Sequence, residues 1–238
     1  MTTASPAPVP DAPAGHVPDL AGTVPEAWRP YVDRAALGRV ERFLGAEVAA
    51  GRRIQPLRAQ VFRALQLVAP DDVRVVLCGQ DPYPTPGVPI GLAFAVAPEA
   101  PIPGSLRNMY AELEADLGIP PASTGDLTPW ARSGMLLLNA SLTVAPNAPG
   151  SHKPAGWHDV TFELLRRLAA ARTGIVFLAL GRHAQDVVAR LPTDGHRVVT
   201  AAHPSPMSAR LFHGSRPFSR TDAALQELGG PPFDWRLG

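Results

Sequence analysis

The 238-residue chain has little of several features that would point to a particular class of protein. It contains a single cysteine, Cys78, which excludes an internal disulfide. It has no run of about 18 apolar residues, which argues against a membrane span. Its first residues lack the basic start and apolar core of a secretory signal. We therefore expect a cytoplasmic protein with no membrane association.

The chain also has no excess of charge of either sign, since its formal net charge is +1 at pH 7. A nearly neutral chain can still carry a local nucleic-acid footprint, and Arg210, Arg216 and Arg220 cluster in SARLFHGSRPFSR. Taken alone, this cluster fits a solvated surface face equally well. No His and Cys residues have the spacing of metal ligands, and neither G-x-G-x-x-G nor a P-loop occurs. We expect no metal and no cofactor, and a nucleotide-binding protein is disfavoured.

Composition divides the chain into a short first segment and one larger domain. Residues 1–24 are dense in proline and alanine and poor in large apolar residues, which predicts a disordered tail. From residue 25 onward the pattern becomes regular, and apolar residues at three- and four-residue spacing over 33–51 predict a helix. We therefore expect one domain over residues 25–238.

Four short apolar runs are typical of buried parallel strands. They lie at residues 73–78, 135–139, 174–180 and 197–201. Helix-period stretches over 105–118, 160–172 and 182–191 are interspersed with them along the chain. This alternation predicts an α/β fold, a three-layer αβα sandwich with a central four-stranded parallel sheet.

Polar side chains follow three of these strands. Asp81 comes just after the first strand, Asn139 ends the second, and His203 follows the fourth. In an open α/β sheet, ligands bind outside the carboxyl ends of the strands, so these residues are expected at one edge. Each has a plainer interpretation when taken singly: a turn-forming aspartate, a helix-capping asparagine and a loop histidine. Their shared position favours a functional site.

The ordered motifs resemble those of the family 1 uracil-DNA glycosylases. The stretch GQDPYPTPGVPIGLAFAV resembles the water-activating loop of that family, PGSLRNMYAEL its Pro-Ser loop and helix, and GMLLLNASLTV its uracil-reading strand. The later blocks follow in the same order: GW at 156–157, FLALGRHAQ, HPSPMSARLFHGSRPFS and FDW. The resemblance covers roughly residues 25 to 236 and implies a single catalytic domain. Such an enzyme flips uracil out of DNA, hydrolyses its N-glycosidic bond and leaves an abasic site.

For catalysis, the resemblance implies roles for Asp81 and His203. Cleaving an N-glycosidic bond requires stabilising a cationic sugar, a leaving uracil anion and an attacking water. Asp81 would orient that water and offset the positive charge of the sugar. His203, as a neutral imidazole, would donate a hydrogen bond to uracil O2.

The resemblance also implies a uracil pocket formed by Gln80, Tyr83, Phe94 and Asn139. The Asn139 amide can pair with uracil N3–H and O4, whereas cytosine presents the reverse pattern. Phe94 would stack on the extruded base. Tyr83 would occupy the space that the C5-methyl group of thymine requires. These residues together predict selection of uracil over both other pyrimidines.

Four further residues are implied to bind DNA. Ser105, Ser205 and Ser208 would pinch phosphates, and Met207, where the family usually has leucine, would enter the space left by the flipped base. The expected partners are uracil-containing single- and double-stranded DNA and a uracil-glycosylase inhibitor protein. The protein is expected to act as a monomer.

Two positions in the first motif depart from the family pattern. Pro84 and Ile90 each stand where the family typically has histidine, and Pro84 also removes a backbone N–H. These losses predict a slower enzyme whose specificity for uracil is intact. The alternative is a weakened family member that acts as a DNA-binding or inhibitor-sequestering module, or as a glycosylase of altered specificity.

Overall fold

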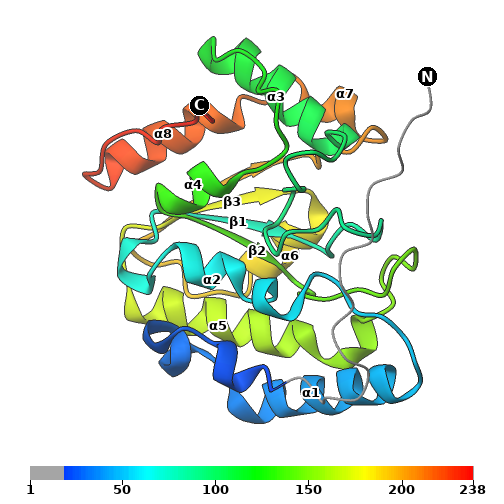
Figure 1. The fold of residues 1–238 in the computed structure, drawn as a ribbon. Coiled ribbons are helices and arrows are strands. Elements are labelled where there is room, and N and C mark those ends of the chain that lie inside the picture. Colours follow the sequence, from blue (N-terminus) through cyan, green and yellow to red (C-terminus); the bar gives the residue numbers. More distant parts are fainter. Residues whose placement is uncertain (1–18, 238) are drawn as a thin grey trace, which may run out of the picture.

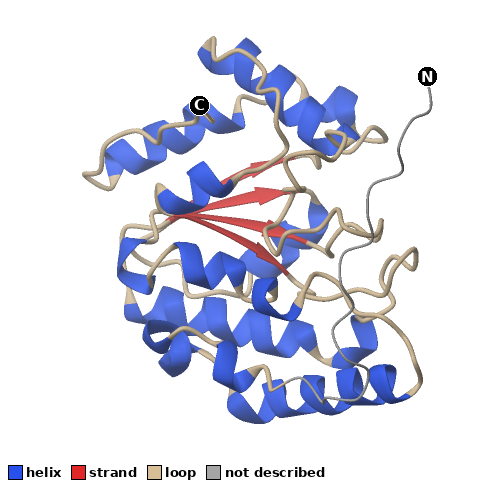
Figure 2. Ribbon diagram, viewed as in Figure 1, coloured by secondary structure: helices blue, strands red, loops and turns tan. Residues whose placement is uncertain are grey.

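The computed structural model describes residues 19–237, which form a parallel sheet covered by helices on both faces (Figures 1 and 2). In Figure 1, α1 and α5 lie below the sheet and α3, α4 and α8 lie above it. The sequence-based prediction of a three-layer αβα sandwich is confirmed. No helix of the described part is long and apolar enough to cross a membrane.

Four strands form the central sheet, in the order β2-β1-β3-β4 and all parallel. Their bounds are β1 Val75–Gly79, β2 Met135–Asn139, β3 Val176–Leu180 and β4 Arg197–Ala201. The first three are buried along their whole length, as expected for strands covered on both faces. The edge strand β4 is partly exposed. All four predicted strands are confirmed, with the first and third starting two residues later than expected.

Eight α-helices surround the sheet within the described residues. They are α1 Arg34–Ala49, α2 Arg63–Leu67, α3 Gly104–Leu117, α4 Thr128–Arg132, α5 Trp157–Ala171, α6 Arg182–Val188, α7 Ala209–Phe212 and α8 Pro217–Glu227. Local sequence explains several ends: Asp33 caps α1 by accepting hydrogen bonds from two backbone N–H groups, and Gly118 ends α3 in the left-handed conformation. Five short 3-10 helices complete the set: Ala21–Thr23, Glu26–Tyr31, Arg58–Gln60, Pro70–Asp72 and Lys153–Ala155.

Four fully buried tryptophans tie distant segments to the core. Each indole N–H has a hydrogen-bond acceptor, as burial of a polar group requires. Trp130 donates to the carbonyl of Trp235 at 2.9 Å, and Trp235 donates to Asp222 at 3.0 Å. These bonds fasten the segment after α8 to α4 and to α8 itself.

The predicted boundary between tail and domain is wrong for residues 19–24. Leu20 and Val24 are buried in the core, and the Leu20 and Ala21 N–H groups donate to the Glu41 carboxylate at 2.7 and 3.0 Å. Folded structure therefore includes at least six residues that were assigned to the tail. The rest of the predicted tail, residues 1–18, lies outside the described residues.

Candidate functional site

The carboxyl ends of the four strands meet at one edge of the sheet, on the right in Figure 1. Gly79 and Asn139 are opposite each other at the ends of β1 and β2, and Leu180 lies opposite Ala201 at the ends of β3 and β4. The parallel pairing therefore delivers the Asp81 loop, Asn139 and the loop of His203 to the same edge.

The Asp81 loop continues the pairing of β1 with β2 beyond the strands. The Ala140 N–H donates to the Gly79 carbonyl at 3.0 Å, and the Ser141 N–H donates to the Gln80 carbonyl at 2.9 Å. The Gln80 side chain is exposed. Asp81 itself has one buried oxygen, Oδ1, that accepts no hydrogen bond from the described residues. An acceptor of this kind is available to a ligand at the site.

Asn139 is buried at the end of β2, with 6% of its surface exposed. Its amide lies directly against Gly79, since a Cβ atom added to Gly79 would come within 2.1 Å of the Asn139 Oδ1. Glycine at this position thus leaves the space that the amide occupies. The same hypothetical Cβ would lie 2.9 Å from the Cβ of Ala93, so the space at Gly79 is closed on two sides.

Phe94 and His203 face each other across the site, with ring centroids 5.8 Å apart and planes inclined by 34°. Phe94 has a φ of 65°, in the left-handed region, which costs on the order of 1–3 kcal/mol for a residue with a side chain. The neighbouring Ala93 N–H donates to the Leu137 carbonyl of β2 at 3.0 Å and holds this backbone in place. Strain of this kind, kept by surrounding structure, is typical of functional sites.

The hydrogen bonds of His203 define its tautomer. Its Nδ1 accepts a hydrogen bond from the Ser205 N–H at 3.0 Å, so the proton of the neutral ring is on Nε2. Burial lowers the pKa of His203 below its usual value, which favours this neutral form. His203 therefore offers a neutral N–H donor. Gly181 makes room for it, because a Cβ there would lie 2.7 Å from the Cβ of His203.

The two serines after His203 are linked to each other and to the histidine. The Ser205 and Ser208 hydroxyls lie 2.9 Å apart, and Ser208 donates to the His203 carbonyl at 2.6 Å. Between them, Met207 is 99% exposed. An apolar side chain held fully in solvent by an ordered loop is available to enter another molecule.

Helix α3 brings the remaining predicted DNA-binding residue, Ser105, toward this loop. The Asn108 amide donates to the Pro204 carbonyl at 2.7 Å, and a Cβ on Gly104 would lie 2.8 Å from Pro206. Ser105 follows Gly104 in the first turn of the helix. The start of α3 and the loop of His203 therefore form one continuous surface.

Tyr83 lies in the same proline-rich loop as Asp81 and is half-buried, and the desolvation of its phenol raises its pKa to about 12. Its phenol is therefore neutral at physiological pH. The carbonyl of Tyr83 accepts a hydrogen bond from the side chain of Gln55 at 3.1 Å. Nothing in the local sequence around Gln55 pointed to this contact.

The two positions that depart from the family pattern differ in environment. Ile90 is 5% exposed and packs in the hydrophobic core. Pro84 lies in the loop itself, where its carbonyl accepts a hydrogen bond from the Asn147 N–H at 2.7 Å. The backbone of the loop is thus held by groups outside it.

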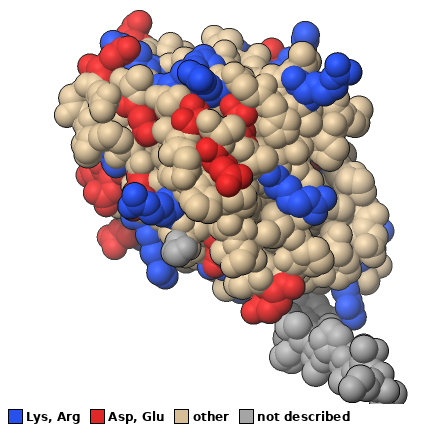
Figure 3. All heavy atoms as spheres, turned by 90° about the horizontal axis from the view of Figure 1, so that it is seen from above, with Lys and Arg blue, Asp and Glu red and all other residues tan. Residues whose placement is uncertain are grey.

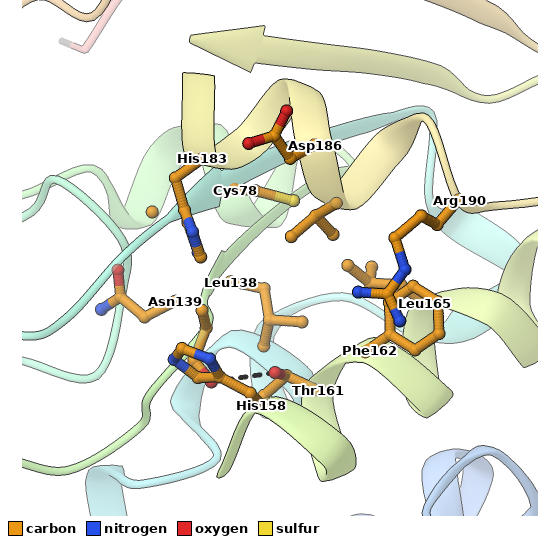
Figure 4. A pocket seen from close by; sticks show the side chains of 13 residues that line it. Cys78, Leu138, Asn139, His158, Thr161, Phe162, Leu165, His183, Asp186 and Arg190 are labelled. Atoms are coloured by element: carbon orange, nitrogen blue, oxygen red, sulfur yellow. Dashed lines mark hydrogen bonds between the residues drawn. The ribbon is translucent and has the colours of Figure 1, made fainter. Parts of the chain in front are cut away.

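A cavity of about 180 Å³ lies between the sheet and helices α5 and α6 (Figure 4). Asn139 contributes to its wall, but Phe94 and His203 do not, so it borders the candidate site without forming it. His158 and His183 reach into it from the two helices, with ring centroids 5.7 Å apart. Burial is the main cause that lowers the pKa of His183, and the neighbouring His158 lowers it further. Within residues 19–237, no three His, Cys, Asp or Glu side chains form a metal-binding group.

Comparisons with known proteins agree in sequence and in fold. The family model described as the uracil DNA glycosylase superfamily matches residues 66–228. The chain is 52% identical over 200 residues to uracil-DNA glycosylase 1 of Streptomyces coelicolor, covering 82% of this chain and 86% of that protein. It is 50% identical over 214 residues to the uracil-DNA glycosylase of Thermobifida fusca, covering 89% and 92%. A solved mimivirus UNG variant in complex with UGI matches with a TM-score of 0.87 at 25% identity, covering 92% of this chain and 91% of that chain.

Proposed function

Because this chain belongs to the uracil DNA glycosylase superfamily, we propose that it is a DNA repair enzyme that excises uracil. It flips uracil out of DNA, hydrolyses the N-glycosidic bond, releases free uracil and leaves an abasic site. The observation that carries this proposal is the convergence of Asp81, Asn139, Phe94 and His203 at one edge of the sheet. About half of all aligned residues are identical to relatives named as this enzyme, which disfavours a weakened, non-catalytic member.

In the proposed reaction, Asp81 and His203 act on opposite charges. The Asp81 carboxylate, whose Oδ1 is buried, orients the attacking water and offsets the positive charge that develops on the sugar. The water oxygen bonds to C1′ of the sugar as the C1′–N1 bond breaks, and the proton that the water loses passes to Asp81. The His203 Nε2–H donates to uracil O2 as the base leaves with the bonding electrons. A fixed neutral donor suffices in such a site, because it needs no reorganisation as charge develops. No metal or cofactor takes part.

Selection of uracil depends on donor and acceptor geometry and on shape. The Asn139 Oδ1 accepts from uracil N3–H while its Nδ2 donates to O4, and cytosine would leave both groups unpaired in a buried place. Phe94 stacks on the base, a contact worth about 1–3 kcal/mol. The Tyr83 ring excludes the C5-methyl group of thymine. Gln80 lies between β1 and Asp81 and contributes to the same pocket.

The DNA is held by phosphate contacts and one apolar wedge. Ser105, Ser205 and Ser208 contact phosphates, and the fully exposed Met207 fills the space left by the flipped base. Acidic and basic side chains are interspersed on the face over α3 and α8 (Figure 3).

We further propose the partners and the setting of the enzyme. It acts as a monomer in the cytoplasm on uracil in single- and double-stranded DNA. Because the mimivirus neighbour was solved in complex with UGI, a uracil-glycosylase inhibitor protein is proposed to bind this chain as well.

Single-turnover uracil release tests the proposal directly. An end-labelled oligonucleotide with one uracil, in single- and double-stranded form, is incubated with excess protein and then cleaved by alkali at abasic sites. Cleavage at the uracil position is expected with both substrates, and EDTA should leave the rate unchanged. No release from either substrate, or release that EDTA abolishes, would refute the proposal. An oligonucleotide with thymine in place of uracil is the matched control.

A further inference from the structure

The loop that carries Asp81 and Tyr83 has few backbone N–H groups with which to satisfy its own carbonyls. Pro82, Pro84 and Pro86 alternate with the other residues, so three of the five positions from 82 to 86 have no N–H to donate. The carbonyl groups remain, and buried or half-buried carbonyls need donors. Those donors have to come largely from other parts of the chain.

The structure identifies the external donors. Gln55 Nε2 donates to the Tyr83 carbonyl at 3.1 Å and makes a longer contact of 3.4 Å with the Thr85 carbonyl. The Asn147 N–H donates to the Pro84 carbonyl between them at 2.7 Å. Three consecutive carbonyls thus have a contact from outside the loop, two of them from a single side-chain amide, and the Thr85 carbonyl also accepts a hydrogen bond from the Val88 N–H at 3.2 Å.

Gln55 is itself held in place. It is 7% exposed, and its backbone exchanges two hydrogen bonds with Val144, at 3.0 and 2.9 Å. Val144 lies five residues after Asn139, in the segment that continues into Asn147. The donor amide and the Asn147 N–H therefore belong to one paired unit, which is continuous with the strand that ends in Asn139.

We propose that Gln55 is a positioning residue for uracil excision: its amide holds the Tyr83–Thr85 backbone, so that Asp81 meets the water and Tyr83 blocks thymine. This inference rests on the proposed function. An amide suits the task because its two N–H groups can serve two carbonyls at once, which neither a hydroxyl nor a carboxylate can do. The loop is then kept in register with the base-reading strand.

Replacing Gln55 by leucine tests the assignment, since leucine keeps much of the volume and removes both donors. The single-turnover rate of uracil release is expected to fall at least tenfold, because a misplacement of about 1 Å can cost roughly a hundredfold. The ratio of thymine to uracil release should rise at the same time, since Tyr83 is no longer held. Gln66→Leu is the matched control, because Gln66 also donates to a backbone carbonyl, that of Ala59 at 3.1 Å, but away from the site.

Gln55→Glu supplies a readout that a general packing defect would not produce. Ionised glutamate presents only acceptors to the two carbonyls, whereas the protonated acid can donate to one of them. The rate of Gln55→Glu relative to the unmodified protein should therefore rise several-fold from about pH 8 to about pH 5. The same ratio for Gln55→Leu should stay flat. If Gln55→Leu does not fold, the pH profile of Gln55→Glu alone tests whether Gln55 is a positioning residue.

The outcomes separate this inference from the function on which it rests. If the unmodified protein releases uracil and Gln55→Leu matches its rate and base preference, the inference alone is overturned. A flat pH ratio for Gln55→Glu overturns it as well. If the unmodified protein releases no uracil from any substrate, the proposed function fails and the inference fails with it.

Discussion

Gly79→Ala should disable the site without replacing any residue proposed to contact DNA, because the new side chain displaces the Asn139 amide. The new Cβ would lie 2.1 Å from the Asn139 Oδ1 and 2.9 Å from the Ala93 Cβ. Non-bonded carbon atoms optimally lie about 3.5–4.0 Å apart, so the amide has to move by at least about 1 Å. The backbone on both sides is fixed by the β1 and β2 pairing and by the bond from Ala93 to Leu137.

A shift of about 1 Å in a reacting or reading group can cost roughly a hundredfold in rate. A hundredfold corresponds to about 2.7 kcal/mol of transition-state stabilisation. We therefore expect the kcat/KM for uracil release to fall by about that factor. The backbone of Gly79 is in ordinary extended conformation, so alanine adds no dihedral strain. The fall in kcat/KM therefore measures the effect of the steric clash between the new Cβ and the Asn139 amide.

The assay is single-turnover release of uracil from an end-labelled oligonucleotide, with DNA binding measured in parallel. Gly38→Ala is the control, because its Cβ would meet only the flexible Arg42 guanidinium at 3.7 Å and the site is in α1. Binding to uracil-free DNA should be unchanged in both variants. A Gly79→Ala enzyme with at least half the normal rate would show that the Asn139 amide does not read the base from this position.

Three further predictions concern the same site and three histidines whose pKa burial lowers. Asp81→Asn should lower the rate at least about a hundredfold while sparing DNA binding, and an equal loss of binding would indicate a structural role instead. Tyr83→Ala should release thymine as well as uracil, which quantification of both free bases would check. Burial lowers the pKa of His152, His183 and His203 below the usual value of 6.5, so the unfolded chain binds more protons once the pH falls toward that value. The free energy of unfolding should therefore decrease below about pH 6.5, and a thermal midpoint that is constant from about pH 7.5 to about pH 5.5 would contradict this.

The sequence was sufficient to predict the sheet and the edge at which the site lies. Buried parallel strands are short apolar runs, and the carboxyl ends of such strands share one edge. Asp81, Asn139 and His203 could therefore be placed together before any contact was known. Their proposed roles came from the resemblance, because chemistry depends on angles and protonation that strand order does not define.

Other features depend on contacts between distant residues and left no local signal. Gln55 reaches the Asp81 loop only because its backbone pairs with Val144. Ile90 stands where the family typically has histidine, and the motif alone did not show that its side chain packs in the core. Leu20 and Val24 stand in a proline- and alanine-rich segment, and two isolated apolar residues do not change its average composition. Their burial is a tertiary property.

The order of strands in the sheet has a consequence for how the enzyme is made. Val75 of the central strand pairs with Met135 on one side and with Val176 on the other. Synthesis proceeds from the N-terminus, so the segment with Asp81 emerges early, while the second neighbour of its strand emerges only much later. Such non-local pairing is slow and leaves an unpaired strand exposed in the meantime. A nascent chain that stopped before residue 176 would carry the motif GQDPY without the complete sheet that positions it, and glycosylase activity has to wait still longer, until His203 has been synthesised.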